Sequence, residues 1–119
     1  MTLEHFKLEE FDSPDMPGSG SNMDETFLEM LDEARDIADI SFKINSGYRS
    51  ESHNTKVGGV ANSSHLKGFA ADIHCTDSTK RFIILNALMI AGLNRVGVAK
   101  TFIHVDNDPD KSPDVIWTY

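Results

Sequence analysis

Three of the five histidines stand where they could share a metal ion with a carboxylate. His5 and His53 lie in polar stretches without an acidic partner at a useful spacing, which leaves His65, His74 and His104 as candidates. A catalytic zinc site uses three protein ligands of the His or carboxylate type and keeps a fourth position open for water. The chain therefore contains enough ligands for one such site.

The best candidate ligands fall in two short segments. Residues 63–72 read Ser-Ser-His-Leu-Lys-Gly-Phe-Ala-Ala-Asp, so a turn at Gly68 would let His65 and Asp72 converge from a loop and the adjoining strand. A third ligand would come from the apolar segment Phe102–Asp106, in which His104 and the closing aspartate share one strand face. Spacing alone leaves an alternative open, because a histidine in a serine-rich loop often only hydrogen-bonds to solvent.

The pattern Ser63-x-His65-x-x-Gly68-x-Ala70-x-Asp72, followed by an apolar strand with His104, resembles the zinc D-alanyl-D-alanine carboxypeptidase and endolysin L-alanyl-D-glutamate peptidase family. That family shares its fold with hedgehog domains and the lysostaphin-like group. The likeness runs from about Phe6 to the C-terminus. It includes Ser46-Gly47-Tyr48-Arg49-Ser50, Asn54, Val57-Gly58-Gly59, Phe102-Ile103-His104-Val105-Asp106 and Trp117-Thr118-Tyr119.

The resemblance implies a function and roles for individual residues. His65, Asp72 and His104 match the family's Zn²⁺ ligands, and Arg49 matches an arginine that holds a substrate carboxylate or carbonyl. We expect Ser63 to contact the substrate, although a loop serine more often caps its own turn. The implied activity is zinc-dependent hydrolysis of peptide bonds in bacterial peptidoglycan stem peptides, by carboxypeptidase or endopeptidase action. The implied setting is a phage or prophage, as an endolysin or part of a virion.

The general base departs from the family pattern. Many relatives place a glutamate three residues before the last histidine ligand, where this chain has Thr101, which cannot take a proton at neutral pH. Asp106 is the nearest carboxylate, so we expect it to act either as the base or as a residue that orients a ligand. The missing glutamate also permits an alternative function, a zinc-containing but inactive peptidoglycan-binding or structural module.

Four further residues invite a chemical interpretation, but a structural one is preferred. His74 shares the presumed strand face of Asp72, and we expect it to be structural. Cys75 lacks the His and Asp or Asn partners of a cysteine nucleophile. Trp117 and Tyr119 could line a sugar or peptide groove, although aromatic residues near a chain end more often close the core.

Length and composition limit the remaining possibilities. At 119 residues we expect a single zinc peptidase-like domain over residues 1–119, and a net charge of −8 argues against nucleic-acid partners. No apolar run is long enough to cross a bilayer, and Met1–Glu10 lacks the profile of a secretory leader. We therefore expect cytoplasmic synthesis without membrane insertion, and action on the cell wall after release.

The periodicity predicts an α+β fold with helices on a small, mainly antiparallel sheet. Residues 11–22 are rich in turn formers and predict a surface loop. Asn22 and Glu25 have the outline of a capping box for a helix reaching Ala38, and Ser78 is a plausible N-cap for a second helix over 79–91. A short helix is expected near 52–57, and strands are expected over 41–46, 69–74, 101–105 and 115–118.

Overall fold

The computed structural model describes residues 1–119 and contains one five-stranded sheet. The strand order is β1-β2-β4-β3-β5, and every neighbouring pair is antiparallel except β3 with β5, which is parallel. The predicted α+β fold with a mainly antiparallel sheet is confirmed. The strands are β1 (Ile44–Ser46), β2 (Ala70–His74), β3 (Arg95–Val98), β4 (Phe102–Asp106) and β5 (Val115–Thr118).

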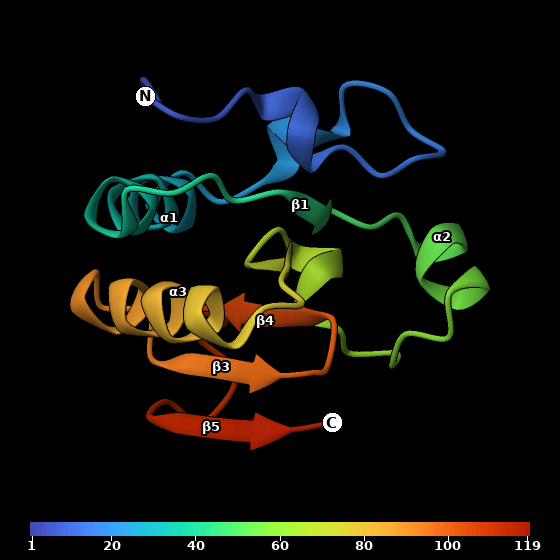
Figure 1. Ribbon diagram of the computed structural model, residues 1–119. Coiled ribbons are helices and arrows are strands. Elements are labelled where there is room, and N and C mark those ends of the chain that lie inside the picture. Colours follow the sequence, from blue (N-terminus) through green and yellow to red (C-terminus); the bar gives the residue numbers. More distant parts are fainter.

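Helices α1 and α3 lie side by side next to the sheet, and the short α2 lies at the other side of the molecule (Figure 1). The three α-helices are α1 (Glu25–Ala38), α2 (Glu51–Lys56) and α3 (Ser78–Ile90). Three single turns of 3₁₀ helix complete the fold: η1 (Leu8–Phe11), η2 (Ser19–Asn22) and η3 (Ser64–Lys67).

The two central strands direct alternate residues to opposite faces of the sheet. Ala71 and Ile73 of β2, with Ile103 and Val105 of β4, join the core that α1 and α3 cover. The intervening residues of both strands therefore face away from the helices, because successive side chains of a strand alternate. The buried polar residues among them are Asp72, His104 and Asp106, so one sheet face is apolar core and the other carries the candidate site residues.

Both long helices begin at residues other than the predicted caps. The N-cap of α1 is Asp24, whose carboxylate accepts from the N–H of Phe27 at 2.9 Å, whereas Asn22 ends the preceding 3₁₀ turn. Likewise α3 is capped by Asp77, not Ser78. A carboxylate caps as well as a serine and also interacts favourably with the partial positive charge of the helix N-terminus.

The remaining predicted helix and strands are present, although β1 covers only the second half of the segment 41–46, and the 3₁₀ turns η1 and η3 were not predicted. Two further differences stand out. The segment 11–22 is not loop throughout, because its last four residues form η2. The strand β3, Arg95–Val98, is absent from the sequence prediction. It pairs with β4 to form a hairpin and supplies the strand against which β5 lies.

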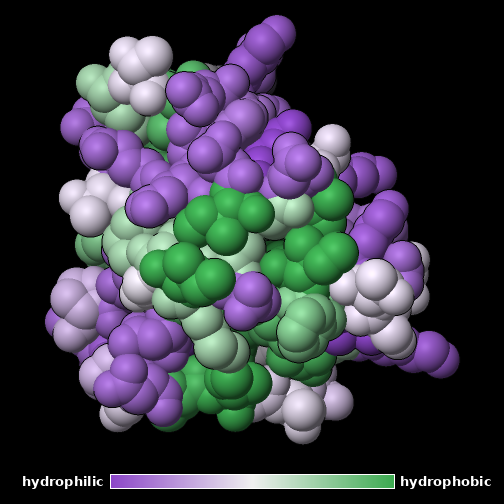
Figure 2. Space-filling model, turned by 60° about the vertical axis from the view of Figure 1, so that its left-hand side comes forward, coloured by the Kyte–Doolittle hydropathy of each residue, from purple (hydrophilic) through white to green (hydrophobic).

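Part of α3 remains apolar on the side that faces solvent. Figure 2 shows hydrophobic residues gathered on the face that comes forward from the left of Figure 1. The large exposed apolar side chains of α3 are Phe82, Met89 and Ile90, and Ile116 of the edge strand β5 is exposed as well. None of the helices combines the length and the apolar character that a bilayer span requires.

Substitutions by alanine at a buried and at an exposed position of α3 should affect the free energy of unfolding very differently. Leu88 is completely buried and Ile90 is 61% exposed. We expect Leu88→Ala to lower the free energy of unfolding by about 2–5 kcal/mol, and Ile90→Ala to change it by less than about 1 kcal/mol. Urea denaturation followed by circular dichroism measures both, and equal effects would contradict this description of the core.

Candidate metal centre

One row of cross-strand partners runs across the whole sheet on the face opposite the helices. Ser46 of β1 pairs with Asp72 of β2, which pairs with His104 of β4. His104 in turn pairs with Gly97 of β3, and Gly97 pairs with Trp117 of β5. The pairing register therefore fixes which side chains meet in the middle of this face.

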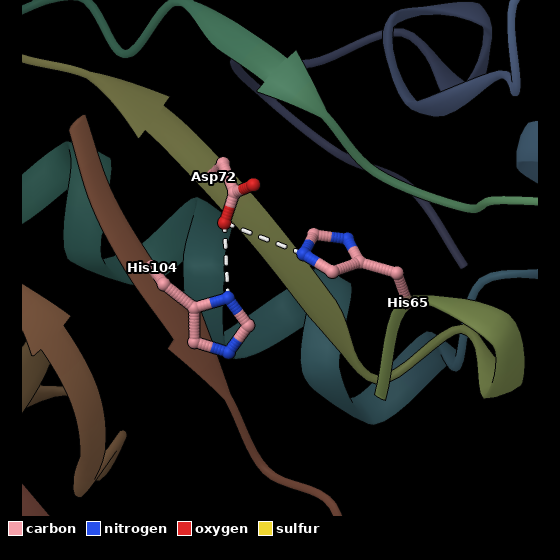
Figure 3. Close-up of side chains that lie close together, drawn as sticks. All are labelled: His65, Asp72 and His104. Carbon is pink, nitrogen blue, oxygen red and sulfur yellow. Dashed lines mark hydrogen bonds and ion pairs between the residues drawn. The ribbon is translucent and has the colours of Figure 1, made fainter. Parts of the chain in front are cut away.

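Asp72 and His104 are in direct contact at the centre of that row (Figure 3). The Nδ1 atom of His104 lies 2.9 Å from Oδ1 of Asp72, and both residues are buried. The Nε2 atom of His65 approaches the same carboxylate oxygen at 3.3 Å. The three predicted ligands therefore converge from a 3₁₀ turn and two neighbouring strands.

The orientation of His65 is fixed by its own loop. His65 lies in η3, whose N-cap Ser63 accepts from the backbone N–H of His65 at 3.2 Å. Gly68 ends the turn at φ +80°, a conformation that favours glycine, so the turn predicted there is present. The Nδ1 atom of His65 lies 2.7 Å from the carbonyl oxygen of Gly47, which accepts its proton and leaves Nε2 facing Asp72.

The arrangement of these atoms suits a zinc ion. One ligand atom from each of His65, Asp72 and His104 lies within 4.8 Å of the others. Zinc bonds of about 2.0–2.1 Å at tetrahedral angles place neighbouring ligand atoms about 3.3 Å apart, close to the two contacts with Asp72. Two imidazoles and one carboxylate are also a ligand set that zinc prefers. The donor chemistry and the spacing both fit this metal.

Electrostatics keep the carboxylate ionised. Burial by itself would raise the pKa of Asp72, but hydrogen bonds from His104 and His65 outweigh it and hold that pKa well below its usual range. Burial lowers the pKa of His104, whereas its hydrogen bonds with Asp106 and Asp72 act more strongly and raise it. In the metal-free protein these residues are therefore a closely coupled group of opposite charges.

Asp106 contacts the side of His104 that faces away from Asp72. Its Oδ2 atom lies 2.7 Å from His104 Nε2, and its Oδ1 atom accepts from Nε of Arg95 at 2.7 Å. The backbone N–H of Asp108 also approaches Oδ1, at 3.2 Å. Both oxygens of this buried carboxylate are thus occupied, and the His104 ring is held between two aspartates.

Arg49 lies beside the ligands and is oriented by three acceptors. Its Nε donates to Ser46 Oγ at 3.0 Å, its Nη1 to Asn54 Oδ1 at 3.2 Å, and its Nη2 to Asp72 Oδ2 at 3.3 Å. Asn54 is buried and is itself held by a bond from Nδ2 to the carbonyl of Val60. Arg49 therefore fixes the second oxygen of Asp72 and leaves Oδ1 to the two histidines.

A cavity of about 340 Å³ opens over the ligands. Trp117 forms part of its wall, with its ring centre 5.5 Å from that of His104 and 5.2 Å from the Arg95 guanidinium carbon. A side chain on Gly97 would collide with the indole, because an added Cβ would lie 2.4 Å from its Nε1. The absence of a side chain at this position leaves room for the indole of Trp117, which is tilted by 47° to the ring of His104.

Asp108 ties the loop of one ligand to the strand of another, and the sequence analysis missed it. Its fully buried carboxylate accepts from Ser64 Oγ at 2.8 Å and from Lys67 Nζ at 3.0 Å. Lys111 Nζ donates to the same serine at 2.9 Å. Two residues of η3, which carries His65, are thus attached to the segment that follows β4.

Several other candidates lie away from the cavity lining. Thr101 and His74 are exposed, and Cys75 is a buried free thiol at the end of β2. His5, which the sequence analysis set aside for lack of an acidic partner, does have one: its Nε2 atom lies 3.2 Å from Asp36. That pair is at the surface and is separate from the buried group of His65, Asp72 and His104.

The fold and the candidate site together indicate which class of protein this is. A mainly antiparallel sheet that presents two histidines and an aspartate in an open cavity is the arrangement of a small metallopeptidase. The chain belongs to the family described as Peptidase M15, whose model matches residues 4–106. The predicted family is therefore confirmed. Peptidases of this family depend on zinc and act on peptides. A search among curated proteins found no match to the chain.

The Asp108 contacts predict a pH-dependent contribution to stability. Burial alone would raise the pKa of Asp108, but the N–H of Asp110, the Ser64 hydroxyl and Lys67 lower it overall. A pKa lowered by folding contributes stability above the unfolded value of about 3.9, and that contribution is lost as the pH falls through the folded value.

We therefore expect Asp108→Asn to lower the free energy of unfolding by about 2–3 kcal/mol at pH 7 and by progressively less below pH 4. Urea titrations of both proteins between pH 7 and pH 2.5 measure the difference. Asp114→Asn, at an exposed position, is the control. A difference that stayed constant with pH would contradict an ionised role for this carboxylate.

Proposed function

We propose that the protein hydrolyses peptide bonds in the stem peptides of bacterial peptidoglycan with a zinc ion held by His65, Asp72 and His104. The observation that carries this proposal is the convergence of three buried ligand atoms beneath an open cavity. The zinc ion would supply Lewis acidity toward a peptide carbonyl and make water a better nucleophile. The substrate class, and an origin in a phage or prophage with action on the bacterial cell wall, are what the family resemblance implies.

The residues of the chain have separate tasks in this proposal. His65 and His104 present one nitrogen each, and their other nitrogens are held by the Gly47 carbonyl and by Asp106. Arg49 stands at the rim of the ligand group with a guanidinium that has five N–H bonds, of which three are used within the protein. The remaining N–H bonds can hold a substrate carboxylate or carbonyl. Ser63 lines the same cavity and remains a candidate for substrate contact.

Asp106 is better suited to orient His104 than to act as a general base. Its Oδ2 atom contacts the ring nitrogen remote from Asp72, and Arg95 occupies Oδ1. A carboxylate behind a ligand histidine fixes the ring and increases its basicity as a ligand. We propose this role for Asp106, which leaves the identity of the base open and keeps the inactive module as the alternative function.

The function is tested with purified peptidoglycan and the zinc-loaded protein. We expect new amino groups without new reducing sugar ends, and mass analysis of the fragments to identify the cut peptide bond. Treatment with a chelator, and the variant His104→Ala, should each abolish the release. Zinc binding without any release from several peptidoglycan types would instead support the inactive module.

The proposed role of Asp106 predicts a change in metal affinity. We expect Asp106→Asn to weaken zinc binding about 10–100-fold, because a neutral amide oxygen accepts the hydrogen bond from His104 more weakly than a carboxylate does. Competition with a chromogenic chelator measures the affinity, and Asp110→Asn at an exposed position is the control. Unchanged zinc affinity with a turnover rate reduced more than about 100-fold would instead identify Asp106 as the base.

A further inference from the structure

Most of the side-chain nitrogen atoms around the cavity already donate one hydrogen bond to an acceptor of the protein. Three nitrogens of Arg49 do so, and Arg95 donates to Asp106 and to a backbone carbonyl. Lys111 donates to the hydroxyl of Ser64. A peptide carbonyl that gains negative charge during hydrolysis is stabilised by donors already aimed at it. A donor without an acceptor in the protein is therefore of particular interest.

Two hydroxyl groups of the cavity wall, those of Ser63 and Tyr119, donate to no protein acceptor. Ser63 is only 5% exposed, and its oxygen is used to cap η3. Tyr119 is 69% exposed, so its hydroxyl group can reach an incoming substrate. Tyr119 thus carries the more accessible of these two hydroxyl groups.

The strand β5 fixes the side of the sheet on which Tyr119 lies. The backbone N–H of Tyr119 donates to the carbonyl of Val98 at 3.2 Å, and this bond continues the pairing of β5 with β3. Tyr119 stands two residues after Trp117, so both side chains share the face that carries His104. The ring of Tyr119 packs against Phe102 with ring centres 5.2 Å apart. The ring is therefore supported at the edge of the cavity while the hydroxyl remains free.

The surroundings of Tyr119 keep its proton in place. Partial burial of the side chain against the cavity wall raises the pKa of the phenol, and the carboxylates of Asp72 and Asp106 raise it further, whereas Trp117 and Arg49 lower it. The overall shift is upward, so the hydroxyl remains a neutral donor at physiological pH. Tyr119 lines the same cavity as His65, Asp72 and His104.

We infer that Tyr119 is a further catalytic residue, whose hydroxyl donates a hydrogen bond to the carbonyl oxygen of the scissile peptide as that oxygen gains negative charge. The proton stays on the phenol throughout, and no bond to Tyr119 forms or breaks. This inference rests on the proposed peptidase function. It adds a neutral donor to the N–H bonds of Arg49 that remain free for the substrate.

The variant Tyr119→Phe tests the inference because it keeps the ring and its packing on Phe102. With purified peptidoglycan as substrate we expect kcat to fall about 10–1000-fold, while KM and zinc content change less than about twofold. Thr118→Val is the matched control, because it removes an exposed hydroxyl from the opposite face of the same strand. The control should keep its activity.

A binding measurement separates this role from general damage to the site. A phosphinate analogue of the stem dipeptide places charged oxygens where the substrate carbonyl would react. We expect Tyr119→Phe to weaken its binding, measured by calorimetry, at least about tenfold. If the wild type is active and Tyr119→Phe has the same kcat and the same affinity for the analogue, the role of Tyr119 is overturned and the proposed function is not affected. A wild type that hydrolyses no peptidoglycan would overturn the proposed function, and the role of Tyr119 with it.

Discussion

The pairing of β2 with β4 is the constraint on which the rest of the site depends. It places Asp72 directly opposite His104 on the sheet face that the helices do not cover. A slip of β2 by one residue would turn Asp72 into the apolar core and bring the neighbouring Ile73 to the site face, and the same slip of β4 would exchange His104 for Ile103. The same burial of Ile73 and Ile103 that stabilises the fold therefore fixes the register that brings the ligands together.

Each of the three candidate ligands has a second polar atom that points away from the other two residues, and each of these atoms has a hydrogen-bond partner in the protein. The Gly47 carbonyl holds His65, Asp106 holds His104, and Arg49 holds the second oxygen of Asp72. Such partners select the tautomer and the direction of each of these three side chains in the metal-free protein. A site prepared in this way loses little conformational freedom on binding, so the geometry of the ligands is a property of the folded chain itself.

The sequence identified the ligand candidates because they lie in short local patterns, a turn at Gly68 and an alternating strand around His104. It could not supply the partners that come from pairing. Arg95 was missed because β3 was not recognised: the strand is short, and Gly97 weakens its pattern. Its signal was present, since two alternating apolar runs separated by a few residues predict a hairpin. The contacts of Asp108 depend on how two distant loops pack, which no local pattern records.

The central claim is that His65, Asp72 and His104 bind one zinc ion and leave a coordination position for water. The most direct measurement is a crystal of the zinc-loaded protein with anomalous diffraction recorded on both sides of the zinc absorption edge. The account predicts one strong anomalous peak bonded to His65 Nε2, His104 Nδ1 and an oxygen of Asp72, with no fourth protein ligand. A peak elsewhere, or a fourth protein atom bonded to the ion, would contradict it.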